Sequence, residues 1–155
     1  MMVLETMISE NTVKLDISDV DKWTVIEQLV DLIVESGTGY DREDILAAVI
    51  ERERQGSTGI ENGIAVPHAR SNGVSEFACA VGVSRRGIDF DSADQKPCHL
   101  IFLIVAPHQE STKYLKALSA VAYIGNNEDR TARLVAADSP EEVISILGEN
   151  DMTFV

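Results

Sequence analysis

The longest uninterrupted apolar segment of this chain covers residues 100–106, Leu-Ile-Phe-Leu-Ile-Val-Ala. A run of this length suits a buried β-strand, because a helix that crosses a bilayer takes about 20 such residues. The chain has 155 residues, enough for one domain that buries about two thirds of its unfolded surface. We therefore expect a single domain, residues 1–155, with a buried sheet.

Strand and helix patterns alternate along the chain. Strands are predicted over residues 13–17, 64–66, 77–84 and 99–106, and a turn over residues 85–91 enters a short edge segment. Helices are predicted over residues 22–36, 41–55, 111–124 and 130–137, and from the capping box that begins at Ser139 with Pro140 in the first helical position. Asp19 or Asp21 is the candidate cap of the first helix. This alternation predicts an α/β fold with a mixed β-sheet flanked by helices on both faces.

A glycine-punctuated turn, a short apolar strand and a histidine follow one another in residues 59–70, Gly-Ile-Glu-Asn-Gly-Ile-Ala-Val-Pro-His-Ala-Arg. Pro67 fixes its own φ near about −65° and biases Val66 toward extended backbone. We therefore expect His68 on a stiff backbone where the strand ends. A histidine held in this way suits chemistry near neutral pH.

Three kinds of chemistry are open to His68 if it is not simply a surface or core residue: general base, metal ligand or nucleophile. His99 and His108 are the other histidines, and the chain has no C-x-x-C or H-x-x-x-H spacing, so a metal site lacks partners. A G-x-S-x-G serine elbow is also missing. We therefore expect neither a metal nor an organic cofactor.

As a nucleophile, a neutral imidazole with its ordinary pKa of about 6.5 can accept a phosphoryl group and release it again from a labile phosphoramidate. Such a site needs positive charge near the transferred oxygens, and arginine supplies it through a planar fork. Arg52, Arg54 and Arg70 lie close to His68 in the sequence. Two of them also have an ordinary interpretation: Arg52 is a cation near a helix carboxyl end, and Arg70 is an exposed side chain. The hydroxyls of Ser57 and Thr58 either serve the turn or meet the phosphoryl group.

Residues 52–68, Arg-Glu-Arg-Gln-Gly-Ser-Thr-Gly-Ile-Glu-Asn-Gly-Ile-Ala-Val-Pro-His, resemble the signature of the type 2 enzyme IIA family of the phosphoenolpyruvate-dependent sugar phosphotransferase system. This family contains the fructose and mannitol IIA components and the nitrogen-regulatory IIA proteins. The resemblance covers about residues 12–147 and rests on G-I-A-V-P-H with Arg52 sixteen residues before His68. It implies a mixed sheet flanked by helices. It also implies that His68 accepts a phosphoryl group from the phosphocarrier HPr, and that Arg52 is the arginine beside this histidine.

The chain departs from the family pattern at the second histidine, which precedes a leucine at the start of a later helix. The corresponding dipeptide here is Tyr114-Leu115. A phenol can donate a hydrogen bond to a phosphoryl oxygen but cannot carry positive charge. We expect Tyr114 near His68, and His108 is the alternative substitute for the missing histidine. The departure puts the efficiency or direction of transfer in question rather than the acceptor.

Charge and resemblance together define the expected partners. A formal net charge of −13 argues against binding to nucleic acid or to an anionic membrane. The first residues contain no basic leader or sustained apolar segment, and the two cysteines indicate no disulfide scaffold, so we expect a cytoplasmic protein. The resemblance implies an HPr-type carrier as donor, and a IIB component or a regulatory target as the next partner. The missing second histidine and the absence of transporter domains favour a nitrogen-regulatory type over a sugar-transport IIA or a degenerate binding module.

Overall fold

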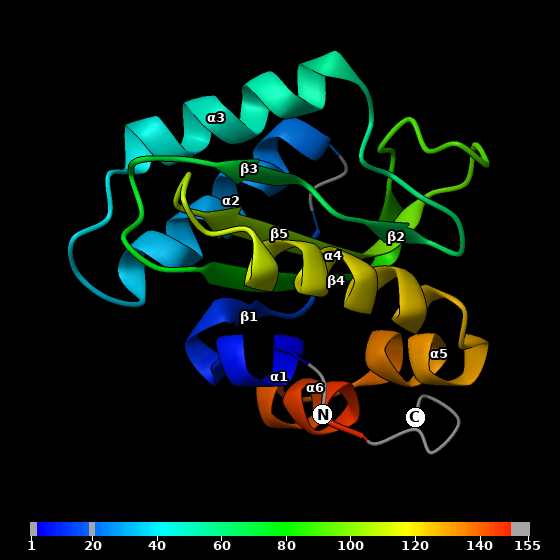
Figure 1. Ribbon diagram of the computed structural model, residues 1–155. Helices are drawn as coiled ribbons and strands as arrows, with labels where there is room; N and C mark the ends of the chain where they lie inside the picture. Colours follow the sequence, from blue (N-terminus) through cyan, green and yellow to red (C-terminus); the bar gives the residue numbers. More distant parts are fainter. Residues whose placement is uncertain (1–2, 19–20, 150–155) are drawn as a thin grey trace.

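The computed structural model describes residues 3–18 and 21–149, and Figure 1 gives the arrangement of their helices and strands. In chain order the elements are α1 (Val3–Met7), the 3₁₀ turn η1 (Glu10–Thr12), β1 (Val13–Lys14), α2 (Lys22–Glu35), α3 (Arg42–Gln55), β2 (Ile64–Ala65), β3 (His68–Arg70), β4 (Ala78–Ile88), β5 (Cys98–Ala106), α4 (Thr112–Gly125), α5 (Glu128–Ala136) and α6 (Pro140–Leu147). Within these described residues, no helix combines the length and the apolar character needed to span a membrane.

The strands form one mixed sheet, as the sequence predicts. Its order is β1-β4-β5-β2, and β3 also pairs with β5. The long strands β4 and β5 are antiparallel, whereas β1 pairs with β4, and β2 and β3 pair with β5, in parallel. β5 therefore lies inside the sheet, and the segment that contains His68 forms an edge beside it.

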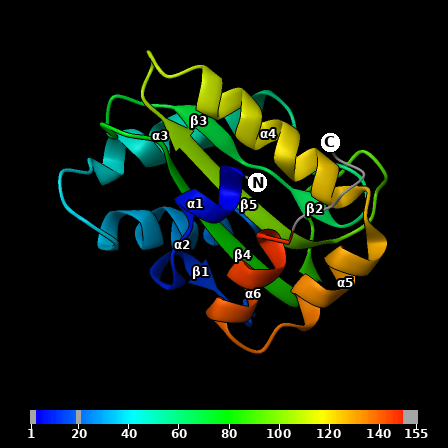
Figure 2. The same ribbon diagram turned by 60° about the horizontal axis from the view of Figure 1, so that its bottom comes forward.

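Helices cover both faces of this sheet, which confirms the predicted layers. In Figure 2, α1, α4, α5 and α6 lie in front of the sheet, and α2 and α3 lie behind it. Successive residues of β5 alternate between the two cores: Leu100, Phe102 and Ile104 pack on the α4 side, and Ile101, Leu103 and Val105 pack on the α2 and α3 side. Because side chains alternate along a strand, a strand buried on both faces must be apolar throughout. This is the physical reason for the uninterrupted apolar run.

Polar caps set where the helices begin. The Asp21 carboxylate accepts from Thr24 N, and the Asp41 carboxylate accepts from Asp44 N. Ser139 caps α6 by accepting from Glu142 N, as its capping box predicts. Asn127 caps α5, which starts two residues before the predicted helix at 130–137. Asp19, the other candidate cap of α2, lies outside the described residues.

Two strand boundaries differ from the prediction by three or more residues. β1 ends at Lys14 rather than at residue 17, because Asp16 takes a φ of 55° and leaves the extended conformation. β4 does not turn at residue 85 but continues to Ile88 through a register shift after Val83. Such an irregularity lets a strand bend without ending, so the polar residues 85–87 do not form the predicted turn.

Candidate functional site

His68 lies on the edge segment that runs beside β5. β2 pairs Ile64 with Leu100, and β3 continues in the same register by pairing His68 with Ile104. Pro67 separates the two strands because proline has no N–H to donate to the ladder. His68 therefore begins a new strand instead of standing where a strand ends, which corrects the expected placement. The backbone is held on both sides of it, since Ile104 N donates to Pro67 O at 3.1 Å before His68 and Ser71 N donates to Ala106 O at 2.9 Å after it.

The turn before this segment depends on left-handed backbone. Asn62 and Gly63 have φ values of 66° and 77°, and Ile60 N donates to Ile64 O at 2.8 Å. Glycine adopts this conformation without steric cost, and asparagine adopts it more readily than most other residues. The Asn62 amide also donates to Gly125 O at 2.7 Å, which ties the turn to the end of α4. The glycines of the motif thus shape the turn that leads to His68.

The imidazole of His68 is held in one tautomer by its own backbone. Nδ1 lies 2.7 Å from Val66 O. Because a carbonyl oxygen only accepts, Nδ1 carries the proton and Nε2 keeps its lone pair. Burial lowers the pKa of His68 below its ordinary value, and the charge of Arg52 lowers it further, against the opposing effects of Val66 O and the Glu53 carboxylate. His68 is therefore a neutral imidazole with a free Nε2 at neutral pH.

Tyr114 lies beside His68, as the family resemblance implies. It is buried in the first turn of α4, and its ring meets the imidazole edge-on, with the ring centroids 5.9 Å apart at an interplanar angle of 61°. Burial raises the pKa of Tyr114, and the charges of Arg70 and Arg52 oppose this shift. The side chain is thus a neutral phenol. His108, the alternative substitute, is exposed in the turn between β5 and α4.

Arg70 also belongs to this group of side chains. It lies two residues after His68 on β3, so both project from the same side of the strand, while Ala69 between them packs in the opposite core. The Arg70 guanidinium carbon lies 4.7 Å from the centroid of the Tyr114 ring. The sequence left the location of Arg70 open. The signal that could have placed Arg70 at the site is its position two residues after His68 in an extended segment, because such side chains project from the same side of a strand.

Arg52 approaches the site from the last turn of α3. Its Nη1 donates to Gly56 O at 2.9 Å, so it supports the carboxyl end of the helix. Its charge also contributes to the low pKa of His68. The two interpretations of Arg52 are thus compatible, because its charge acts on His68 while its Nη1 bonds Gly56 O. Arg54 is exposed on the same helix.

A buried ion pair holds the loop between α3 and His68. The Glu53 carboxylate, with a fully buried side chain, accepts from Lys22 Nζ at 3.2 Å, from Thr58 N at 3.0 Å and from Thr58 Oγ1 at 2.6 Å. The Ser57 hydroxyl donates to Phe90 O. Both hydroxyls of the loop are therefore used in its own structure, in agreement with the turn interpretation. Thr58 O in turn accepts a hydrogen bond from Val66 N, so the loop also positions the segment that leads to His68.

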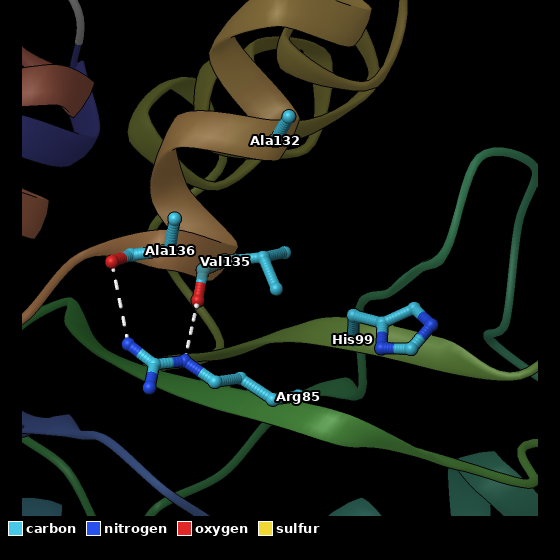
Figure 3. A pocket seen from close by; sticks show the side chains of 5 residues that line it. All are labelled: Arg85, His99, Ala132, Val135 and Ala136. Atoms are coloured by element: carbon cyan, nitrogen blue, oxygen red, sulfur yellow. Dashed lines mark hydrogen bonds between the residues drawn. The ribbon is translucent and has the colours of Figure 1, made fainter.

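A separate hollow lies at the other end of β5. Figure 3 shows it lined by Arg85, His99, Ala132, Val135 and Ala136, with a volume of about 620 Å³. Arg85 donates to Val135 O at 3.2 Å and to Ala136 O at 3.3 Å, so its charge is used at the carboxyl end of α5. His99 stands near the start of β5, whereas the partner of His68 stands near its end. Among the described residues, no cluster of His, Cys, Asp and Glu side chains is arranged to hold a metal ion, here or beside His68.

Fold and site together define a class of protein, a mixed-sheet α/β domain that presents a neutral histidine next to arginine and tyrosine side chains. A family model described as "Phosphoenolpyruvate-dependent sugar phosphotransferase system, EIIA 2" matches residues 6–150. The chain therefore belongs to this family.

Three relatives illustrate the range of the family. The chain is 35% identical over 150 residues to the PTS system fructose-specific EIIABC component of Bacillus subtilis, a match that covers 97% of this chain but only 24% of that protein. It is 40% identical over 124 residues to the PTS system fructose-specific EIIA component of Haloferax volcanii, and the match covers 80% of each. The crystal structure of nitrogen regulatory protein IIA-Ntr from Neisseria meningitidis superimposes with a TM-score of 0.86 at 28% identity, over 94% of this chain and 99% of that one. The chain thus spans about a quarter of the length of the EIIABC relative.

Proposed function

We propose that this protein is a phosphocarrier that accepts a phosphoryl group on Nε2 of His68 from a phosphorylated HPr-type protein. The observation that carries the proposal is the 2.7 Å hydrogen bond between Nδ1 and Val66 O, which leaves Nε2 unprotonated. The low pKa of His68 adds to it, because only the neutral imidazole is a nucleophile. Membership of the EIIA 2 family supports the same chemistry.

The transfer needs no proton movement at His68. The Nε2 lone pair forms a bond to phosphorus while the bond between phosphorus and the donor atom of the carrier breaks, and its electron pair stays with the carrier. Nδ1 keeps its proton and its hydrogen bond to Val66 O throughout. The reverse sequence of bond changes passes the group to the next acceptor. No metal or organic cofactor takes part in this scheme.

Arg52 and Tyr114 have different roles in this scheme. Arg52 orients the imidazole or neutralises the phosphoryl oxygens, since its charge already acts on His68. The phenol of Tyr114 donates a hydrogen bond to the phosphoryl group from the position of the family's second histidine. A phenol stays neutral, so it stabilises the bound group less than an imidazolium would. We infer that this substitution favours a regulatory output, in which the phosphorylation state is the signal.

Transfer to a transporter is the second candidate output. The fructose-specific names of two relatives favour a IIB component as the acceptor, whereas the nitrogen regulatory relative favours a target protein. Incubating the phosphorylated protein with a fructose-type IIB domain separates the two. Rapid loss of the phosphoryl group to IIB supports transport, and a stable phosphorylated form supports regulation. Both outputs belong to the cytoplasm, where free thiols such as Cys79 and Cys98 stay reduced.

The test of the acceptor is direct. The protein is incubated with phosphoenolpyruvate, enzyme I and HPr, and the acid-labile modification is followed by intact-mass spectrometry in wild type, His68→Ala and the matched control His108→Ala. Wild type and the His108 variant should gain one phosphoryl group, and His68→Ala should gain none. Equal labelling of His68→Ala and wild type would show that the acceptor lies elsewhere.

A further inference from the structure

The arginines of this protein differ in whether a carboxylate pairs with them. Arg42 bonds the carboxylates of Glu27, Asp31 and Glu43, and Arg133 bonds that of Glu149. No carboxylate lies within ion-pair distance of Arg70 among the residues that the structure describes. Four of the eight arginines, Arg42, Arg85, Arg130 and Arg133, form ion pairs, and Arg70 is among the four that form none within the described part of the chain. Its positive charge is therefore free to act on a ligand.

The guanidinium of Arg70 is also partly withdrawn from water. Its Nε is buried and has no hydrogen-bond partner within the described part of the chain. Leaving a buried donor unsatisfied costs about 1–3 kcal/mol, and more for a charged group. Such a donor is usually explained by strain, by a water or by a ligand that completes the site. The neighbouring contacts point to a ligand.

Tyr114 connects Arg70 to His68. The guanidinium lies over the phenol ring at 4.7 Å, and the same ring meets the imidazole edge-on at 5.9 Å between centroids. A planar guanidinium stacks on an aromatic face and keeps the N–H donors on its rim free. The ring therefore holds the Arg70 guanidinium near His68 and leaves the positive charge of the guanidinium uncompensated.

We propose that Arg70 binds the phosphoryl oxygens on His68, with the Tyr114 ring as the platform that holds its guanidinium in place. The proposal rests on the phosphocarrier function inferred above. Arg70 supplies the positive charge that a phenol cannot provide at the position of the family's second histidine. Its planar fork suits two phosphoryl oxygens at once, and its partial burial strengthens the attraction.

The bond changes at phosphorus stay as described for His68. Arg70 takes no proton and gives none, because arginine stays protonated in proteins. It acts by lowering the free energy of the charged phosphoryl group, both during transfer and afterwards on Nε2. In this arrangement the Tyr114 ring, which supports the guanidinium, contributes more to phosphoryl binding than the Tyr114 hydroxyl does.

The proposal is tested by the rate of phosphoryl gain from phosphorylated HPr and by the lifetime of the phosphorylated form. The variants are Arg70→Met, which keeps length without charge, and Arg70→Lys, which keeps charge without the planar fork. Arg54→Met is the matched control, because Arg54 is an exposed arginine on α3. We expect Arg70→Met to slow phosphoryl gain by about 10-fold or more and Arg70→Lys to fall between it and wild type. Arg54→Met should stay within about 2-fold of wild type.

Two further readouts separate a role in binding from a role in folding. The Arg70 Nε–H signal in ¹⁵N-edited NMR should shift when wild type is phosphorylated, whereas a purely structural arginine would leave it unmoved. Tyr114→Phe should keep most of the rate and Tyr114→Ala should lose as much as Arg70→Met, because the ring and not the hydroxyl holds the guanidinium. If Arg70→Met does not fold, Arg70→Lys and the NMR shift decide.

The two proposals can fail separately. If wild type gains no phosphoryl group on His68, the phosphocarrier function is wrong and Arg70 has nothing to bind. If wild type is phosphorylated and Arg70→Met gains and keeps the group as wild type does, Arg70 is not a phosphoryl-binding residue and the carrier function stands.

Discussion

At the scale of single residues, the site depends on keeping one imidazole neutral and accessible. Burial is the main cause of the low pKa of His68, and the charge of Arg52 adds to it. The proton that remains is on Nδ1, bound to Val66 O. A small change in the surroundings of this ring therefore changes the fraction of molecules that can act as a nucleophile.

The first residue-scale prediction concerns pH. Because the folded protein lowers the pKa of His68, the ring stays neutral to lower pH than an unperturbed histidine, and phosphoryl acceptance is lost only as the pH falls through this lowered value. An NMR titration of the His68 ring should give a midpoint below that of a peptide of residues 59–70. A midpoint equal to that of the peptide, or above it, would contradict the assignment of a buried neutral ring.

The second residue-scale prediction concerns Arg52. Arg52→Lys keeps the charge but loses the planar fork, so phosphoryl transfer should slow by about 10-fold, or about 1.4 kcal/mol in activation free energy. Arg52→Ala should be slower still and should also raise the pKa of His68, because the Arg52 charge lowers it. Stopped-flow transfer from HPr measures the rates, and circular dichroism checks the fold. Unchanged rates in both variants would leave Arg52 with only its bond to Gly56 O.

At the scale of elements, the loop that leads to His68 is held by the end of α3 and the start of α2. The Glu53 carboxylate joins the two helices through Lys22 and joins the loop through Thr58. These contacts lie within the α2 and α3 layer, whereas Tyr114 belongs to α4 on the other face. The site therefore forms where elements from both layers meet the sheet edge.

An element-scale prediction follows from the burial of this pair. Glu53→Gln leaves the Lys22 ammonium buried without its carboxylate, so the free energy of unfolding should fall by about 3 kcal/mol. Asp91→Asn is the matched control. Asp91 also pairs with Lys22, at 3.4 Å, but its side chain is 76% exposed, so the loss should stay below about 1 kcal/mol. Urea denaturation measures both variants, and equal losses would mean that burial of the pair is not what stabilises the loop.

At the scale of the whole molecule, a strongly acidic protein carries a cationic site. The formal net charge is −13, yet the site contains Arg52, whose charge acts on His68 and on Tyr114, and Arg70, whose charge acts on Tyr114. Repulsion by the rest of the surface disfavours anionic macromolecules in general. In the function proposed above, the local positive charge attracts the phosphoryl group to this edge of the sheet.

The sequence by itself determined the layers of this protein. The apolar run at 100–106 predicts a buried strand, and the candidate cap Asp21 and the capping box at Ser139 predict where two of the helices begin. These features are local, because periodicity and capping depend on residues only a few positions apart. The motif around Pro67 and His68 likewise predicted a histidine on a stiff backbone, although not that His68 starts its own strand.

Only the tertiary structure decided how the site is assembled. The Arg70 guanidinium reaches Tyr114 across 44 positions of sequence, and Lys22 reaches Glu53 across 31. The first contact depends on the pairing of β3 with β5 and on how α4 packs against the sheet, and the second depends on how α2 packs against α3. No local pattern encodes these arrangements. The continuation of β4 to Ile88 was hidden for the same reason, because Ile88 pairs with Cys98 of β5 only after a register shift that follows Val83.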